Sequence, residues 1–217
     1  MKVIMISGKI GSGKDTTAAI IKRLLEEQGY TVILKALAEP LKKAVAYMRG
    51  EREGLFHDRN SKDKDDDSLR RKLLIGVGEV MTNNDSHVFA RWVFDAAKEE
   101  IGSKKNHILI VTDLRKASEL FYYQACTINY TIRLKGSFVP CTNPEIAKAN
   151  IECELDYLDD LLQNDEVLYL GDSTSVLKPY CTNSNTGLSD KDIERNKQKN
   201  LNAYKMIINE AIESLSY

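Results

Sequence analysis

Residues 8–14, GKIGSGK, combine three glycines with a lysine at a spacing suited to binding phosphate. The glycines allow the backbone to curl with its N–H groups around phosphate oxygens, and Lys14 supplies a compact positive charge for the outer phosphates. The pattern matches GxxxxGK between an apolar run and a helical pattern, which is the context that makes it specific. A glycine-rich turn that only joins strand to helix is the alternative. The residues expected to bind the nucleotide are Gly8, Lys9, Gly11, Ser12, Gly13, Lys14, Asp15 and Thr16.

The residue after the lysine is Asp15, where this motif usually has a Ser or Thr whose hydroxyl binds magnesium. A carboxylate beside a triphosphate would be repelled at short range, so its presence predicts a divalent cation between the two, bound directly or through water. Thr16 could add a hydroxyl to the same ion. The alternative is that Asp15 is only a favourable carboxylate in the first turn of a helix.

A second group of polar residues follows the apolar run 108–111. Asp113 could reach the metal or its water shell, and Arg115 offers a fork of donors for a phosphate. Both would lie at the end of a parallel strand, where α/β sheets gather their ligands. The alternatives are a helix N-cap for Asp113 and a surface ion pair between Arg115 and Glu119.

Further arginines could bind the acceptor and the phosphoryl group in transit. Phosphoryl transfer needs mainly positioning and charge neutralisation, so a set of arginines suffices without a covalent residue. Arg71 and Arg91 are the candidates, whereas Arg70 and Lys72 belong to a charge run that fits a solvated helix face.

The elements that must position these residues alternate along the chain. Short apolar runs predict strands buried on both faces of a parallel sheet, and the segments between them show helical spacing. This indicates an α/β fold, a parallel sheet with helices on both faces and the first strand at its centre. Strands are expected at 3–6, 31–37, 107–112, 127–134 and 167–170, and helices at 15–29, 40–46, 69–81, 85–101, from 116, at 144–162 and at 190–215.

Length and composition limit the number of domains and the kinds of partner. A chain of 217 residues fits a single domain, with a charged, mobile segment at about 51–68 and a possible lid at about 136–150. The net charge of −1 gives no bulk field for binding a nucleic acid polymer, and no apolar window approaches the roughly 18 residues of a membrane span. The four cysteines lack metal-ligand spacing, so free thiols in a cytoplasmic protein are expected.

Three blocks of residues resemble a known group of enzymes. The blocks are 7–15, 38–42 (AEPLK) and 113–115. They are similar to the P-loop kinase group that contains the deoxynucleoside monophosphate kinases of phages and viruses and the animal-type phosphomevalonate kinases. The spacing from Arg71 to Arg91, with Gly78-Glu79 and Asp85 between them, looks more like the phosphomevalonate kinase branch. Residues 152–156 (ECELD) are similar to an acidic signature of the group.

The resemblance implies a nucleoside-monophosphate-kinase-like P-loop NTPase fold, the cofactors ATP and Mg²⁺, and transfer of the γ-phosphoryl group to a phosphate on a small molecule. It implies catalytic roles for Lys14, Asp15, Asp113 and Arg115, with Asp15, Thr16 and Asp113 around the metal and Arg71, Arg91 and Arg115 on the acceptor.

The acceptor itself is where the two branches differ. Phosphomevalonate kinases carry basic residues where this chain has Ile10 and Gly11, and another base where Thr82 stands. The leading hypothesis from sequence is therefore a deoxynucleoside or nucleoside monophosphate kinase, as a monomer or homodimer, and phosphomevalonate kinase activity is the alternative. A nucleotide-binding regulatory protein with weak ATPase activity is a third hypothesis, but such a protein has no need of acceptor arginines.

Overall fold

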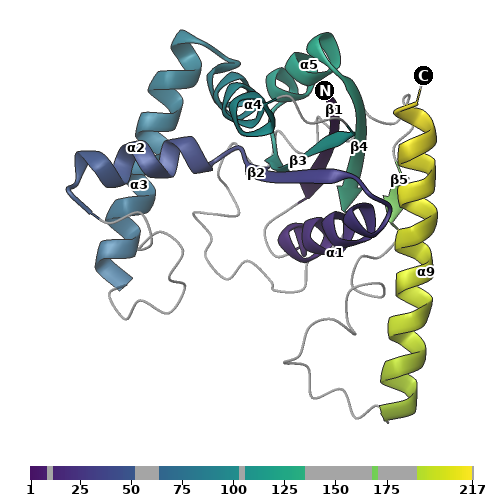
Figure 1. The fold of residues 1–217 in the computed structure, drawn as a ribbon. Helices are drawn as coiled ribbons and strands as arrows, with labels where there is room; N and C mark the ends of the chain where they lie inside the picture. Colours follow the sequence, from purple (N-terminus) through teal and green to yellow (C-terminus); the bar gives the residue numbers. More distant parts are fainter. Residues whose placement is uncertain (9–11, 52–63, 103–105, 135–167, 171–189, 217) are drawn as a thin grey trace.

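The structure is a computed structural model that describes residues 1–8, 12–51, 64–102, 106–134, 168–170 and 190–216 (Figure 1). The expected lid at 136–150, the helix at 144–162 and the acidic signature at 152–156 lie outside these residues. Most of the expected mobile segment at 51–68 does as well, and only Glu51 and the residues from Lys64, where a helix begins, are described.

Five parallel strands form one sheet in the order β2-β3-β1-β4-β5. The first strand is central, as predicted, and its residues from Val3 to Ile6 are fully buried because helices cover both faces. β1 pairs with β3 and β4 from Lys2 onward, so the three strands end at one edge of the sheet. The strands are β1 (Lys2–Gly8), β2 (Thr31–Ala36), β3 (His107–Leu114), β4 (Ile128–Leu134) and β5 (Leu168–Leu170).

The helices follow the predicted pattern with two differences at their starts. One helix begins at Lys64 rather than at Leu69, because the acidic residues 65–67 are favourable beside the positive end of a helix. The next begins at Val88 rather than at Asp85, because the Asp85 carboxylate accepts the backbone N–H of His87 (2.9 Å) in a turn before it. The helices are α1 (Lys14–Glu27), α2 (Glu39–Met48), α3 (Lys64–Asn84), α4 (Val88–Ile101), α5 (Ala117–Cys126) and α9 (Asp190–Ser214).

Two apolar cores cover the two faces of the sheet, which confirms the expected α/β fold. One core joins α1 and α9 to the sheet, and the other joins α4 and α5 to its opposite face (Figure 1). α2 and α3 pack on each other to one side of the sheet (Figure 1). Of the aromatic residues on α4 and α5, Tyr123 is fully buried, while Trp92 remains 40% exposed.

Two further expectations concern membranes and cysteines. Within the described ranges, no helix is both long and apolar enough to cross a bilayer. Cys126 is a free, exposed thiol, and the other three cysteines lie outside the described residues.

The packing of α9 on α1 can be tested with a matched pair of substitutions. Ile208 is fully buried against α1 and the sheet, whereas Met206 on the same helix is 72% exposed. We expect Ile208→Ala to lower the free energy of unfolding by about 2–5 kcal/mol, because it removes buried methyl groups and leaves a cavity. Met206→Ala should change it by less than about 0.5 kcal/mol. Urea denaturation measures both, and equal effects would contradict this packing.

Candidate active site

The glycine-rich segment connects the end of β1 to the start of α1, at the carboxyl edge of the sheet. Gly13 is the N-cap of α1 with φ 82° and ψ 24°, a left-handed conformation that glycine adopts without strain. Its carbonyl accepts the N–H of Thr17 (2.9 Å), so the first helical turn is formed. Lys9, Ile10 and Gly11 lie outside the described residues. The positive end of α1 therefore faces the place where the loop must bind an anion.

The described part of the loop leaves little space for a side chain at Gly8 and has one buried hydroxyl to satisfy. A Cβ added to Gly8 would lie 2.3 Å from Ser12 Oγ and 3.1 Å from Leu134 Cβ. Ser12 is fully buried, and its hydroxyl has no hydrogen-bond partner within the described residues. A buried hydroxyl without a partner costs about 1–3 kcal/mol, which an accepting phosphate oxygen would recover. These features fit the phosphates of a nucleotide.

Lys14 connects the loop to the neighbouring strand. Its side chain is buried, and its Nζ donates to the Gly8 carbonyl at 2.8 Å and lies 3.9 Å from Asp113 Oδ1. Two of the residues expected around a metal come directly after Lys14 at the start of α1. Asp15 is exposed, and Thr16 is half-buried.

The chemistry of these oxygens suits magnesium. Among the described residues there is no group of three or more His, Cys, Asp or Glu side chains that could hold a metal. Magnesium at phosphotransfer sites takes only one or two carboxylates and completes its shell with phosphate oxygens and water. Asp15, Thr16 and Asp113 carry oxygens of the kind that could hold such a metal, and their role stays a prediction.

Asp113 is aimed by an irregularity in β3. The β1–β3 pairing passes from Met5↔Val111 to Ser7↔Leu114, so between these pairs one residue of β1 opposes two of β3, Thr112 and Asp113. Such a bulge bends the strand and redirects a side chain. Asp113 takes a positive φ of 65°, which aspartate tolerates better than most residues. Its carboxylate thereby meets Lys14, and the N-cap of α5 is Lys116 rather than Asp113.

Arg115 is held by its backbone, which leaves the guanidinium for other contacts. Glu119 Oε2 accepts the backbone N–H groups of Arg115 and Lys116, each at 3.0 Å. Glu119 is buried, and this burial raises the pKa of its carboxyl group. The Arg115 guanidinium lies 3.4 Å from Asp113 Oδ1 and is about one-third exposed. Glu119 thus orients the start of α5 instead of forming the surface ion pair weighed above.

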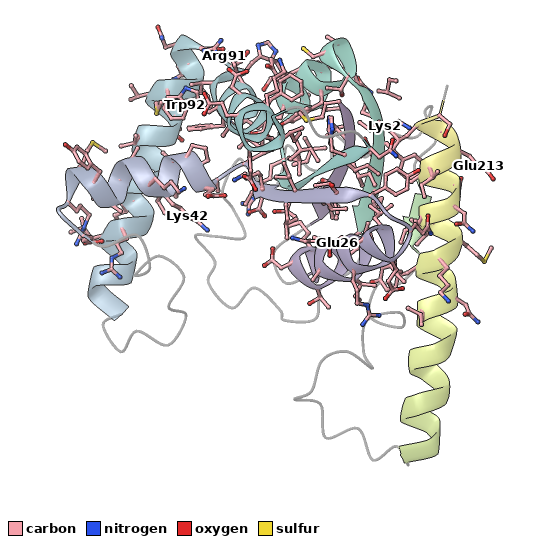
Figure 2. The ribbon with its side chains drawn as sticks, in the orientation of Figure 1. Lys2, Glu26, Lys42, Arg91, Trp92 and Glu213 are labelled. Carbon is pink, nitrogen blue, oxygen red and sulfur yellow. The ribbon has the colours of Figure 1, made fainter. Side chains whose placement is uncertain are left out.

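The other two candidate arginines are placed differently. Arg91 forms an ion pair with Asp85 just before α4, and Figure 2 shows it near the top of the molecule, where α3 and α4 meet. The N–H of His87 and, to a lesser extent, Arg91 lower the pKa of Asp85. Arg71 lies on α3, and its side chain is outside the described part of the structure. The structure thus brings together Lys14, Asp113 and Arg115, and it leaves the roles of Arg71 and Arg91 as predictions.

Some residues around the site escaped the sequence analysis. Arg70 was expected on a solvated face, but its side chain is 11% exposed and its Nε lies 3.2 Å from Glu51 Oε2. Arg133 on β4 is 2% exposed. The signal for Arg133 was available, because a single arginine interrupts an otherwise apolar and β-branched strand end. No local pattern marked Arg70, because its partner Glu51 is distant in the sequence and follows α2.

The fold, the phosphate loop and the Lys14–Asp113–Arg115 group define a P-loop kinase. The family model of phosphomevalonate kinase matches residues 6–129, which is more than half of the 217-residue chain. The chain therefore belongs to the phosphomevalonate kinase family, and the match includes the phosphate loop, Asp113 and Arg115.

Other comparisons are more distant. A search of curated proteins finds no match. Among solved structures, shikimate kinase from Aquifex aeolicus is 12% identical with a TM-score of 0.37, and the alignment covers 80% of this chain and 87% of that one. Shikimate kinase from Acinetobacter baumannii is also 12% identical, with a TM-score of 0.33 and coverage of 82% and 89%. Similarity at this level is too loose to identify an acceptor.

The close approach at Gly8 predicts a specific defect. Gly8→Ala should weaken ATP binding by about tenfold or more and lower the free energy of unfolding by about 1–3 kcal/mol, because the new Cβ is crowded by Ser12 and Leu134. The control is Gly76→Ala on α3, where a Cβ meets nothing within 4 Å and stability should rise by about 0.5–1 kcal/mol. ATP titration and urea denaturation measure these effects. A Gly8→Ala protein that binds ATP as the native chain does would contradict the close approach.

The bulge at Asp113 predicts an unusual order of stability between two variants that both lack the carboxylate. At φ 65° glycine is unstrained while alanine is not, so Asp113→Gly should be more stable than Asp113→Ala by about 1 kcal/mol. The neighbouring Thr112 does not have a positive φ, so Thr112→Ala should be more stable than Thr112→Gly. Thermal or urea unfolding of the four variants measures their stabilities. If the glycine and alanine variants have the same order of stability at positions 112 and 113, the bulge is contradicted.

Proposed function

We propose that this chain transfers the γ-phosphoryl group of ATP to a phosphate carried by a small molecule, and that phosphomevalonate is the first acceptor to test. The observation that carries the proposal is the meeting of Lys14, Asp113 and Arg115 where β1 and β3 end. The family match supports a kinase and favours the phosphomevalonate alternative over the nucleoside monophosphate that led the sequence analysis.

Each residue of the site has a role in such a transfer. The Lys14 ammonium, which donates to the Gly8 carbonyl at the loop, would bind the outer phosphates. Arg115 offers its fork of N–H groups to the group in transit or to the acceptor phosphate. Asp15, Thr16 and Asp113 would hold Mg²⁺, which neutralises charge on the phosphates when bound. Positioning and charge neutralisation then carry the in-line reaction, with no covalent step on the protein.

The acceptor side retains a positive charge despite the threonine at position 82. The Lys116 Nζ donates to Thr82 Oγ1 at 3.3 Å, so an ammonium from the start of α5 lies beside the place where other family members carry a base. Thr82 Oγ1 in turn donates to the Gly78 carbonyl (2.9 Å) and is held on α3. This arrangement supports an anionic acceptor between α3 and α5, next to Arg115.

The same feature keeps a second candidate open. A threonine hydroxyl in place of a base, together with Ile10 and Gly11 in the loop, gives this chain fewer charges for an acceptor than phosphomevalonate kinases carry. A nucleoside monophosphate is the second candidate, because one phosphate and a neutral base need fewer cations than phosphomevalonate with its additional carboxylate.

The deciding experiment measures ADP production with Mg-ATP against phosphomevalonate, the four deoxynucleoside monophosphates and the ribonucleotides. Acceptor-dependent ADP release with phosphomevalonate alone supports the first proposal, and release with a nucleotide supports the second. If ATP binds but no acceptor is used, both are wrong, and a regulatory role for the nucleotide becomes the hypothesis to test.

Arg115→Ala should separate chemistry from nucleotide binding. We expect kcat to fall by about 10²–10³-fold, as it does when one preorganised donor to a transition state is removed, with the Kd for ATP changed by less than about threefold. The substitution leaves the backbone N–H groups bound by Glu119 in place, so the fold should be kept. Arg23→Ala is the matched control, because Arg23 is an exposed arginine on α1 paired with Glu27. Unchanged turnover in Arg115→Ala would remove Arg115 from the reaction.

A further inference from the structure

A buried arginine lies directly behind the phosphate loop. Arg133 is opposite Ser7 in the β1–β4 pairing and is 2% exposed. Its NH1 group donates to Ser7 Oγ at 3.4 Å. Ser7 is itself fully buried and is the last residue before Gly8, where the loop begins.

The hydrogen bonds continue across the next strand. Ser7 Oγ donates to the backbone carbonyl of Leu114 at 2.8 Å, so one chain of side-chain contacts connects β4, β1 and β3. It crosses the sheet where the bulge of β3 has shifted the regular backbone ladder. We call Arg133, Ser7 and the Leu114 carbonyl the cross-strand relay.

Each member of the relay is adjacent to a residue of the site. Ser7 precedes Gly8, whose carbonyl accepts the Lys14 ammonium. Leu114 lies between Asp113 and Arg115 in the sequence. Arg133 precedes Leu134, whose Cβ is 3.1 Å from the position that a Cβ on Gly8 would take. A displacement of the relay would therefore move both halves of the site relative to each other.

A buried arginine at position 133 is energetically costly. Burying a guanidinium carries a large desolvation penalty, and replacing buried charged groups by apolar residues of similar volume is often neutral or stabilising. A guanidinium at position 133 needs contacts that offset its burial, and Ser7 supplies one of them. A positive charge with a planar fork is useful there because it fixes the Ser7 hydroxyl so that it donates toward Leu114.

We propose that Arg133 is a positioning residue that acts through Ser7 to align the phosphate loop with the Asp113–Arg115 segment. The catalytic consequence rests on the proposed function, whereas the effect on nucleotide affinity does not depend on any acceptor. Arg133 does not itself need to touch the nucleotide.

The test is a double-mutant cycle on ATP affinity. The variants are Ser7→Ala, Arg133→Met and the double variant, with Arg133→Lys as the conservative replacement that keeps a donor. Thr131→Val is the matched control, because Thr131 lies two residues earlier on the same face of β4, opposite Met5, and is also buried. The full chain is titrated with ATP without acceptor, and the thermal midpoint of each variant is recorded.

We expect Ser7→Ala and Arg133→Met each to raise the Kd for ATP about tenfold, and the double variant to bind no more weakly than the worse single one, because both remove the same relay. Arg133→Lys should return the Kd to within about threefold of the native value. Thr131→Val should leave it unchanged. With an acceptor, kcat should fall in the same variants.

The proposal would be overturned by an unchanged Kd in Arg133→Met, by additive losses in the double variant, or by an equal loss in Thr131→Val. If the loss of ATP affinity in each variant is proportional to its fall in thermal midpoint, and Arg133→Lys does not restore the affinity, then Arg133 only stabilises the fold. A native chain that binds ATP but uses no acceptor would refute the proposed function and leave the cycle valid, and a native chain that binds no ATP would refute both.

Discussion

The arrangement of the site depends on the parallel pairing of β1 with β3. The pairing places the start of the phosphate loop beside Asp113, so that Lys14 Nζ contacts the Gly8 carbonyl at 2.8 Å and lies 3.9 Å from the Asp113 carboxylate. The side chains of this site come from separate segments, and only the common edge of the sheet brings them within reach of each other. The two apolar cores stabilise that edge, because strands buried on both faces cannot shift register without exposing their side chains.

Positive and negative groups alternate around this edge. The Asp113 carboxylate lies between the Lys14 ammonium and the Arg115 guanidinium, so each charge is partly neutralised before any ligand binds. A bound triphosphate would add negative charge to the same place, which is why a metal near Asp15 and Asp113 suits the chemistry. The left-handed backbone of Asp113 is the conformational cost of this arrangement, and strain of this kind is common where a side chain must be aimed.

One contact between α3 and α5 places a charge that the local sequence of α3 does not contain. The family match extends through α3, α4 and α5, and position 82 on α3 is a threonine. The Lys116 ammonium reaches that hydroxyl from the neighbouring helix, so a positive charge is present in space although it is missing from the local sequence. The charge beside Thr82 therefore depends on the contact between α5 and α3 and not on the residues of α3 alone.

The sequence by itself determined the alternation of strands and helices, the central place of the first strand and the phosphate loop, because these follow from local periodicity and from a motif of contiguous residues. It also pointed to Asp113 and Arg115, since they follow a buried strand. Only the tertiary structure showed that Glu119 holds the backbone of Arg115, that Arg70 is buried against Glu51, and that Arg133 reaches Ser7 across the sheet. These contacts depend on how separate elements pack or on where a turn points a side chain, and the spacing of residue types along the chain does not specify such distances.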